Sequence, residues 1–153
     1  MVAVNIAAVS EALMLGKKAG VDPEMIYQAI RGGLAGSTVM DAKAPMMLDH
    51  HFKPGFRIDL HIKDLNNVFD AAKSVDAPTP LTAQVFEMIK VLRADGCGGC
   101  DHSALAMVYE KLAGEEISRG EESLVRTFCT AAQGRPEMPV SAGSDLPALA
   151  PTP

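Results

Sequence analysis

The sequence predicts an all-α domain of about six or seven helices, and two observations support that prediction. Apolar residues recur at spacings of three and four along most of residues 1–119, whereas no stretch alternates as a half-buried strand would. Aromatic residues make up only 5% of the chain, Trp is absent and there are 9 Met. Such a composition suits helices packed through Ala, Leu and Met better than a β-sandwich.

The first two helices have recognisable ends. A helix over about residues 2–19 carries Lys17-Lys18 in its last turn and is followed by Gly20, a common helix stop. It starts without a capping residue, so we expect Met1 to lie within a helix and not at the usual start of one. The second helix begins at Asp22-Pro23-Glu24, where aspartate is the N-cap and proline the first helical residue, and stops at Gly32-Gly33.

A short helix should follow the glycine-rich loop. Ser37 is a suitable N-cap for it, and Pro45 is expected to end or redirect it, leaving residues 46–48 as a separate apolar turn. After the break at Pro54-Gly55, a long amphipathic helix with one apolar face is predicted over residues 56–75.

Two more helices complete the predicted domain. One follows the proline-containing break at residues 76–80 and runs to about Leu92, and Gly96–Gly99 then interrupts the helical pattern. Asp101 is predicted to cap the last helix. Beyond about Gly120 the chain is rich in Pro, Gly, Ser and Ala. We therefore predict a helical domain at 1–119 and a largely disordered extension at 120–153.

Charge and cysteine usage exclude several classes of protein. The net charge is -5 and the isoelectric point about 5.3, which argues against a nucleic-acid partner. No apolar run is long enough to span a membrane, and the N-terminus lacks the basic region of a signal peptide. Three Cys without a secretory signal predict a reducing, cytoplasmic setting.

Cysteines and histidines are the first candidates for chemistry. Cys97-Gly98-Gly99-Cys100 is a single CxxC, whereas a structural zinc site needs four ligands and a redox CxxC is expected in a β-containing pattern. Ordinary loop cysteines in a turn are the favoured interpretation. His50-His51 and His61 could bind a metal, but no carboxylate or Cys completes a set, so surface histidines are favoured and no metal is predicted.

Lys63 and Asp64 form the most informative polar pair, near the middle of the long helix. By residue chemistry alone, a solvated pair of charges is the slightly favoured interpretation. The alternative is that the Lys63 ammonium binds a phosphate or carboxylate, while Asp64 orients it or contacts a hydroxyl. Phe56 lies eight residues before Asp64, a little over two helical turns, and could form an apolar wall of the same pocket.

Four strings carry a family resemblance: QAIRGGLAGSTV, DAKAPM, FKPGFRIDLHIKDL and LRADG…DHSAL. They resemble the C-terminal helical domain of the β-hydroxyacid dehydrogenases, the family of 3-hydroxyisobutyrate dehydrogenase, and most of all its tartronate semialdehyde (2-hydroxy-3-oxopropionate) reductase branch. The resemblance covers about Val2 to Ser118. It implies an all-α domain like the C-terminal domain of 6-phosphogluconate dehydrogenase, which closes over NAD or NADP held by a Rossmann domain and supports dimerisation.

The resemblance also assigns residues. It implies that Lys63 lies near the cofactor and that Phe56 and Asp64 line the active-site cleft. The family's catalytic lysine and the glycine-rich turn of its Rossmann domain match no position in this sequence, so no catalytic residue is expected here.

The resemblance finally implies a function and its alternatives. We expect a truncated oxidoreductase of the 2-hydroxy-3-oxopropionate reductase type that is inactive alone and whose complete relatives reduce a small semialdehyde to a hydroxyacid. The expected partners are a second copy of the chain and, in complete relatives, that small substrate. The alternatives are a non-enzymatic dimerisation or interaction module, or a fragment of a 3-hydroxyisobutyrate or glyoxylate reductase.

Overall fold

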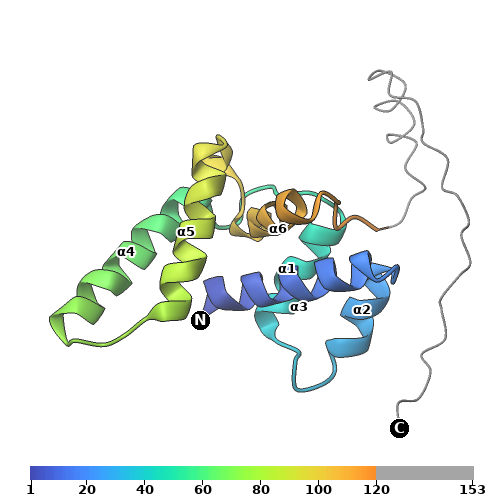
Figure 1. Cartoon of the computed structure of the whole chain (residues 1–153), viewed down its shortest axis with the longest axis horizontal. Coiled ribbons are helices and arrows are strands. Elements are labelled where there is room, and N and C mark those ends of the chain that lie inside the picture. The colour runs from blue at the N-terminus through green and yellow to red at the C-terminus, as the bar shows by residue number, and fades with distance from the viewer. Residues whose placement is uncertain (120–153) are drawn as a thin grey trace, which may run out of the picture. The chain divides into compact units, whose positions relative to one another are not determined.

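The computed structural model describes residues 1–119, and these residues form six α-helices, two short 3-10 helices and no strand (Figure 1). The predicted all-α class is confirmed for this part of the chain. The predicted extension at 120–153 lies outside the described residues. In chain order the elements are α1 (Val2–Lys18), α2 (Pro23–Ile30), α3 (Thr38–Leu48), α4 (Ile58–Ser74), α5 (Pro80–Ala94), η1 (Cys97–Gly99), η2 (His102–Leu105) and α6 (Ala106–Ala113).

Helix α1 is the centre of the packing. It contacts α2, α3, α5, α6 and η2, and Figure 1 shows it crossing the bundle between them. Its buried residues include Ala3 and Ala7 as well as Ile6 and Leu13, so small side chains let neighbouring helices approach closely. Ser10, also buried, donates its hydroxyl to the Ile6 carbonyl at 2.8 Å, which satisfies it within the helix.

Two predicted N-caps are confirmed. The Asp22 carboxylate accepts the Glu24 amide at 3.0 Å at the start of α2. The Ser37 hydroxyl accepts the Met40 amide at 2.9 Å at the start of α3, and it also donates to the Asn5 side-chain oxygen at 2.9 Å. The second contact ties the cap of α3 to α1.

The prediction that Pro45 ends the third helix is wrong. Pro45 lies inside α3, and the Asp49 amide donates to its carbonyl at 2.9 Å, so the helix continues past it. An interior proline costs a helix about 3 kcal/mol. Beyond it, Met47 and Leu48 are buried, each gaining about 1.5–3 kcal/mol by leaving water. Tertiary burial therefore outweighs the local cost.

Helix α4 begins at Ile58, two residues later than predicted. Phe56 and Arg57 remain outside the helix, because Arg57 forms an isolated antiparallel bridge with Asp101 and the Ile58 amide donates to the Cys100 carbonyl at 2.9 Å. Contacts to a distant segment thus occupy backbone groups that a longer helix would have used.

Helices α4 and α5 pack together as a hairpin, drawn in green and yellow in Figure 1. The rings of Phe69 and Phe86 meet edge to face, with their centroids 5.0 Å apart. Within residues 1–119, no helix has both the length and the apolar content needed to cross a bilayer.

Candidate functional site

A fully buried carboxylate lies at the base of α4. Asp101 has no exposed surface, and its oxygens accept hydrogen bonds from the backbone amides of Gly55 at 3.0 Å, Phe56 at 2.9 Å and Ser103 at 2.9 Å. The Lys43 ammonium, from α3, lies 3.0 Å from both oxygens. The predicted cap of the last helix is therefore present, at η2, but it also joins two other segments, α3 and the loop before α4.

Electrostatics keep this carboxylate ionised. Burial alone would raise the pKa of Asp101, but the amides of Phe56 and Ser103 and the Lys43 ammonium outweigh burial and hold the pKa well below its usual range. A buried ion of this kind is stable only while every one of these partners stays in place. The start of α4 is therefore held in a single position.

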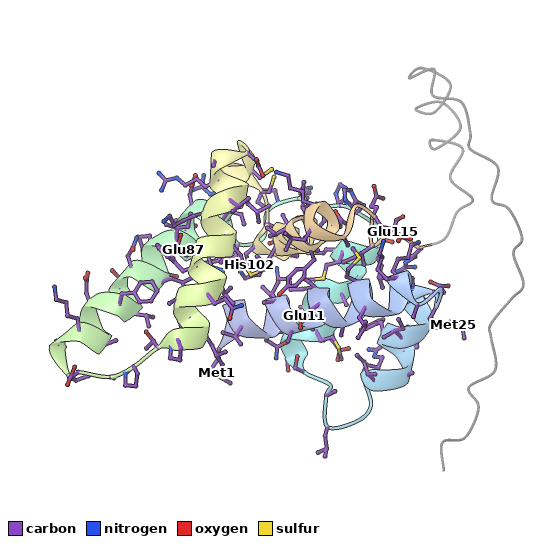
Figure 2. The ribbon with its side chains drawn as sticks, viewed as in Figure 1. Met1, Glu11, Met25, Glu87, His102 and Glu115 are labelled. Atoms are coloured by element: carbon purple, nitrogen blue, oxygen red, sulfur yellow. The ribbon has the colours of Figure 1, made fainter. Side chains whose placement is uncertain are left out.

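Two buried histidines lie beside this carboxylate. The Nδ1 atoms of His61 and His102 are 3.0 Å apart, and each residue is 6% exposed. Figure 2 shows His102 inside the bundle, whereas Glu87 and Met25 lie at its surface. The prediction that His61 is a surface histidine is wrong, because it lies on the buried face of α4. One Nδ1 must donate and the other accept, so at least the accepting ring is neutral in this arrangement.

The surroundings favour the neutral form of both rings. Burial lowers the pKa of both histidines, and for His102 the nearby Lys43 ammonium adds to the effect and the pKa falls to about 4. Phe56 packs against both rings, with centroids 5.7 Å from His61 and 5.2 Å from His102. His102 Nε2 is buried without a hydrogen-bond partner in the described part of the chain.

Lys63 and Asp64 lie on the outer side of α4. Their side chains are 67% and 49% exposed, and the Lys63 Nζ lies 3.3 Å from Asp64 Oδ1. The long lysine side chain thus reaches a sequence neighbour that its helical position alone would not bring close. Asp64 also lies one helical turn after His61, where burial lowers the histidine's pKa and the charge of Asp64 opposes that lowering.

The three residues implied by the family resemblance therefore occupy two environments. Lys63 and Asp64 are paired in solvent, whereas Phe56 is half-buried against the two histidines. His61 is the link, because it contacts Phe56 on one side and lies near Asp64 on the other. Their roles toward a cofactor or substrate stay predictions.

The remaining candidates lie elsewhere. Cys97 and Cys100 are free thiols in the η1 turn, as loop cysteines should be, and residues 1–119 contain no group of three or more metal-ligating side chains. A pocket of 570 Å³ opens beside α6, lined by Cys97, Met107 and Glu110 among others. Lys63 does not line this pocket.

Sequence reasoning missed Lys43, His102 and the wider role of Asp101. The available signal was the run Asp101-His102-Ser103, three polar residues among apolar neighbours, all of which prove to be buried. A cap explains only the first of them. Lys43 had no local signal, because its partner lies 58 residues away in sequence.

Comparison with known proteins agrees with this architecture and defines the class as a helical domain of a nicotinamide-dependent dehydrogenase. Residues 1–109 match the family described as NAD-binding of NADP-dependent 3-hydroxyisobutyrate dehydrogenase. The chain belongs to this family. The resemblance predicted from the sequence is thereby confirmed, as is NAD or NADP as the cofactor class of complete members.

Individual relatives cover a range of substrates. The chain is 41% identical over 118 residues to 2-hydroxy-3-oxopropionate reductase of Escherichia coli, covering 77% of this chain and 40% of that protein. It is 36% identical over 118 residues to 2-(hydroxymethyl)glutarate dehydrogenase of Eubacterium barkeri, covering 76% and 39%. The chain therefore spans about two fifths of the length of these curated relatives.

A solved structure supports the fold. The 3-hydroxyisobutyrate dehydrogenase of Salmonella typhimurium matches with a TM-score of 0.66 and 28% identity, over 70% of this chain and 38% of that one. The described helices are thus arranged as in a dehydrogenase of the same family.

Replacing the buried carboxylate tests its structural importance. Asp101→Asn should lower the free energy of unfolding by about 3 kcal/mol, because the Lys43 ammonium loses its counter-charge in a mostly buried position. Urea denaturation followed by helical circular dichroism measures this. Asp95→Asn is the control: Asp95 pairs with Lys111 in solvent, and its loss should cost under about 1 kcal/mol. Equal losses in the free energy of unfolding for the two variants would contradict the structural importance assigned to Asp101.

The buried histidines predict acid sensitivity. A histidine with a lowered pKa in the folded state binds protons preferentially when unfolded, so stability falls as the pH drops below about 6.5. For His102 alone the loss should reach about 2 kcal/mol by about pH 5, and Asp101 should add a further loss below about pH 4. Urea denaturation across this range tests it. His51→Asn, an exposed control, should keep the full pH dependence, whereas His102→Asn should reduce it.

Proposed function

We propose that this chain supplies the helical wall of the active-site cleft in a NAD(P)-dependent reductase of small hydroxyacid semialdehydes, of the 2-hydroxy-3-oxopropionate reductase type. The observation that carries the proposal is the 41% identity to the Escherichia coli reductase over 118 residues, which includes all of α4. Identity to L-threonate dehydrogenase of Cupriavidus necator is lower, at 34% over 106 residues. The chemistry of the reductase is therefore the preferred assignment.

The residues of α4 fit an anionic group of the cofactor or substrate. The Lys63 ammonium is 67% exposed, so it can bind a phosphate or carboxylate without a large desolvation cost. Asp64 keeps the ammonium on this face of the helix through Oδ1, and its second oxygen can accept a hydrogen bond from a hydroxyl. The nicotinamide supplies the hydride when it is bound, and the part of the protein described here binds and orients.

Helix α4 is suited to this work because its base is rigid. Asp101 fixes the amides of Gly55 and Phe56, and the buried residues Ile58, His61 and Ile62 hold the inner face of the helix. A binding side chain on a rigid helix is placed more accurately than one on a loop. Phe56 would present the edge of its half-buried ring to the same cleft.

We assign no catalytic residue to the described helices. Reduction of a carbonyl requires a general acid that protonates the developing oxyanion. Lys63 is placed for binding, and the neutral pair of His61 and His102 is enclosed in the fold, 6% exposed at each residue. The 153 residues alone should therefore bind more readily than they turn over.

A second candidate function is association between copies of the chain. Helices α4 and α5 expose large apolar side chains, and such surface tends to be covered by a partner. The exposed fractions are 37% for Leu60, 41% for Val68, 61% for Leu81 and 43% for Val91. This candidate is compatible with the first, because a dehydrogenase domain can both line a cleft and dimerise.

Activity measurements test the first proposal. The 153-residue chain should not oxidise NADH or NADPH with tartronate semialdehyde above a no-enzyme blank. A chimera that joins the remaining part of the Escherichia coli reductase to this chain should do so, and Lys63→Gln should raise its KM for the cofactor about tenfold, the value of a charge-assisted hydrogen bond. Lys90→Gln, an exposed lysine of α5, is the matched control. Turnover by the 153-residue chain alone, or an unchanged KM for the cofactor in the Lys63→Gln chimera, would overturn the proposed function.

Size-exclusion chromatography with light scattering tests the second candidate function, association between copies of the chain. The chain should elute as a dimer or larger species at micromolar concentration, and Val68→Glu on α4 should shift it toward the monomer by charging the apolar face. Leu15→Glu on α1, 72% exposed and on another helix, should leave the assembly unchanged. A wild-type chain that stays monomeric at every concentration would rule out self-association.

A further inference from the structure

The CxxC turn is the strongest feature that the proposed function does not use. The Cys100 amide donates to the Cys97 carbonyl at 2.9 Å, which closes the turn around the two glycines. A hydrogen-bonded turn of four residues brings its first and last Cα atoms within about 7 Å, and disulfides span about 4.4–6.8 Å between Cα atoms. The thiols are also close enough to each other for Cys97 to help raise the pKa of Cys100.

Both cysteines are half-buried, but they differ in their surroundings. Cys97 lines the open 570 Å³ pocket beside α6, which gives a small reagent a route to this residue from solvent. Cys100 is half-buried, and burial is the main cause that raises the pKa of its thiol. This asymmetry assigns Cys97 as the attacking thiol and Cys100 as the resolving one.

The turn is joined to the base of α4 at three points. The Cys100 carbonyl accepts the Ile58 amide at 2.9 Å, and Asp101, the next residue, carries the buried carboxylate. Asp59, in the first turn of α4, packs against Gly98 so tightly that a β-carbon there would lie 2.7 Å from its carboxylate. A change in the turn therefore acts directly on the start of the helix that carries Lys63.

We propose that Cys97 and Cys100 form a reversible dithiol–disulfide site whose oxidation state restrains the N-terminal start of α4. The oxidant is a small-molecule disulfide such as oxidised glutathione. The Cys97 thiolate attacks one of its sulfurs and releases one thiolate; Cys100 then loses its proton and attacks Cys97, releasing the second. The protein loses two electrons and two protons, and the small disulfide is reduced to two thiols. This site goes beyond the proposed reductase function and does not depend on it.

Thiol counting tests the chemistry in the full chain. Cys129 lies outside the described residues, so Cys129→Ser isolates the pair. With excess oxidised glutathione, this variant should lose both thiols together and become lighter by two hydrogen atoms, and reduced glutathione should reverse the change. Adding Cys100→Ser should instead yield a mixed disulfide at Cys97. Retention of both thiols, or mixed disulfides alone in the Cys129→Ser variant, would overturn the site.

Amide hydrogen exchange tests the coupling to α4. In the oxidised Cys129→Ser variant, the Ile58 amide should exchange at least several-fold more slowly than in the reduced form, because the carbonyl that it donates to is tethered. The amides of α2, a helix that packs against α1 and α3, serve as the internal reference. An unchanged Ile58 rate in a chain that has formed the disulfide would overturn the restraint of α4.

Discussion

The buried ion pair between Asp101 and Lys43 is the interaction on which the arrangement of the helices around the site depends. A carboxylate with no solvent contact is tolerated only where its charge and lone pairs are matched. Asp101 meets that demand with one ammonium and three backbone amides drawn from α3, the loop before α4 and η2. Those segments are far apart in sequence, and none can move without exposing part of an unpaired charge.

The Asp101–Lys43 pair fixes the start of α4, so that the helix has a buried inner face and a solvent-exposed outer face. Its inner face is held by burial and by the neutral pair of His61 and His102, which packs under Phe56. Its outer face leaves Lys63 and Asp64 in solvent, paired with each other. The proposal that Lys63 binds an anionic ligand rests on this division between a buried inner face and a charged outer face.

Local signals predicted correctly wherever the deciding partner was close in sequence. Asp22 and Ser37 cap their helices through amides two and three residues away. The predictions that failed each depended on a distant contact. Pro45 remains inside α3 because the residues after it are buried, and Phe56 lies outside α4 because Asp101, 45 residues on, holds its amide. His61 is buried because its partner is His102.

The sequence by itself determined the all-α class, most helix boundaries, the family and the identity of the α4 residues to examine, since periodicity, caps and motif strings are properties of neighbouring residues. Only the tertiary structure decided that Lys43 and Asp101 meet, that two histidines share a buried hydrogen bond, and that Lys63 and Phe56 face different surroundings. The physical reason is that the cost of a buried charge or polar ring is offset by partners from other helices, which only the folded chain brings together.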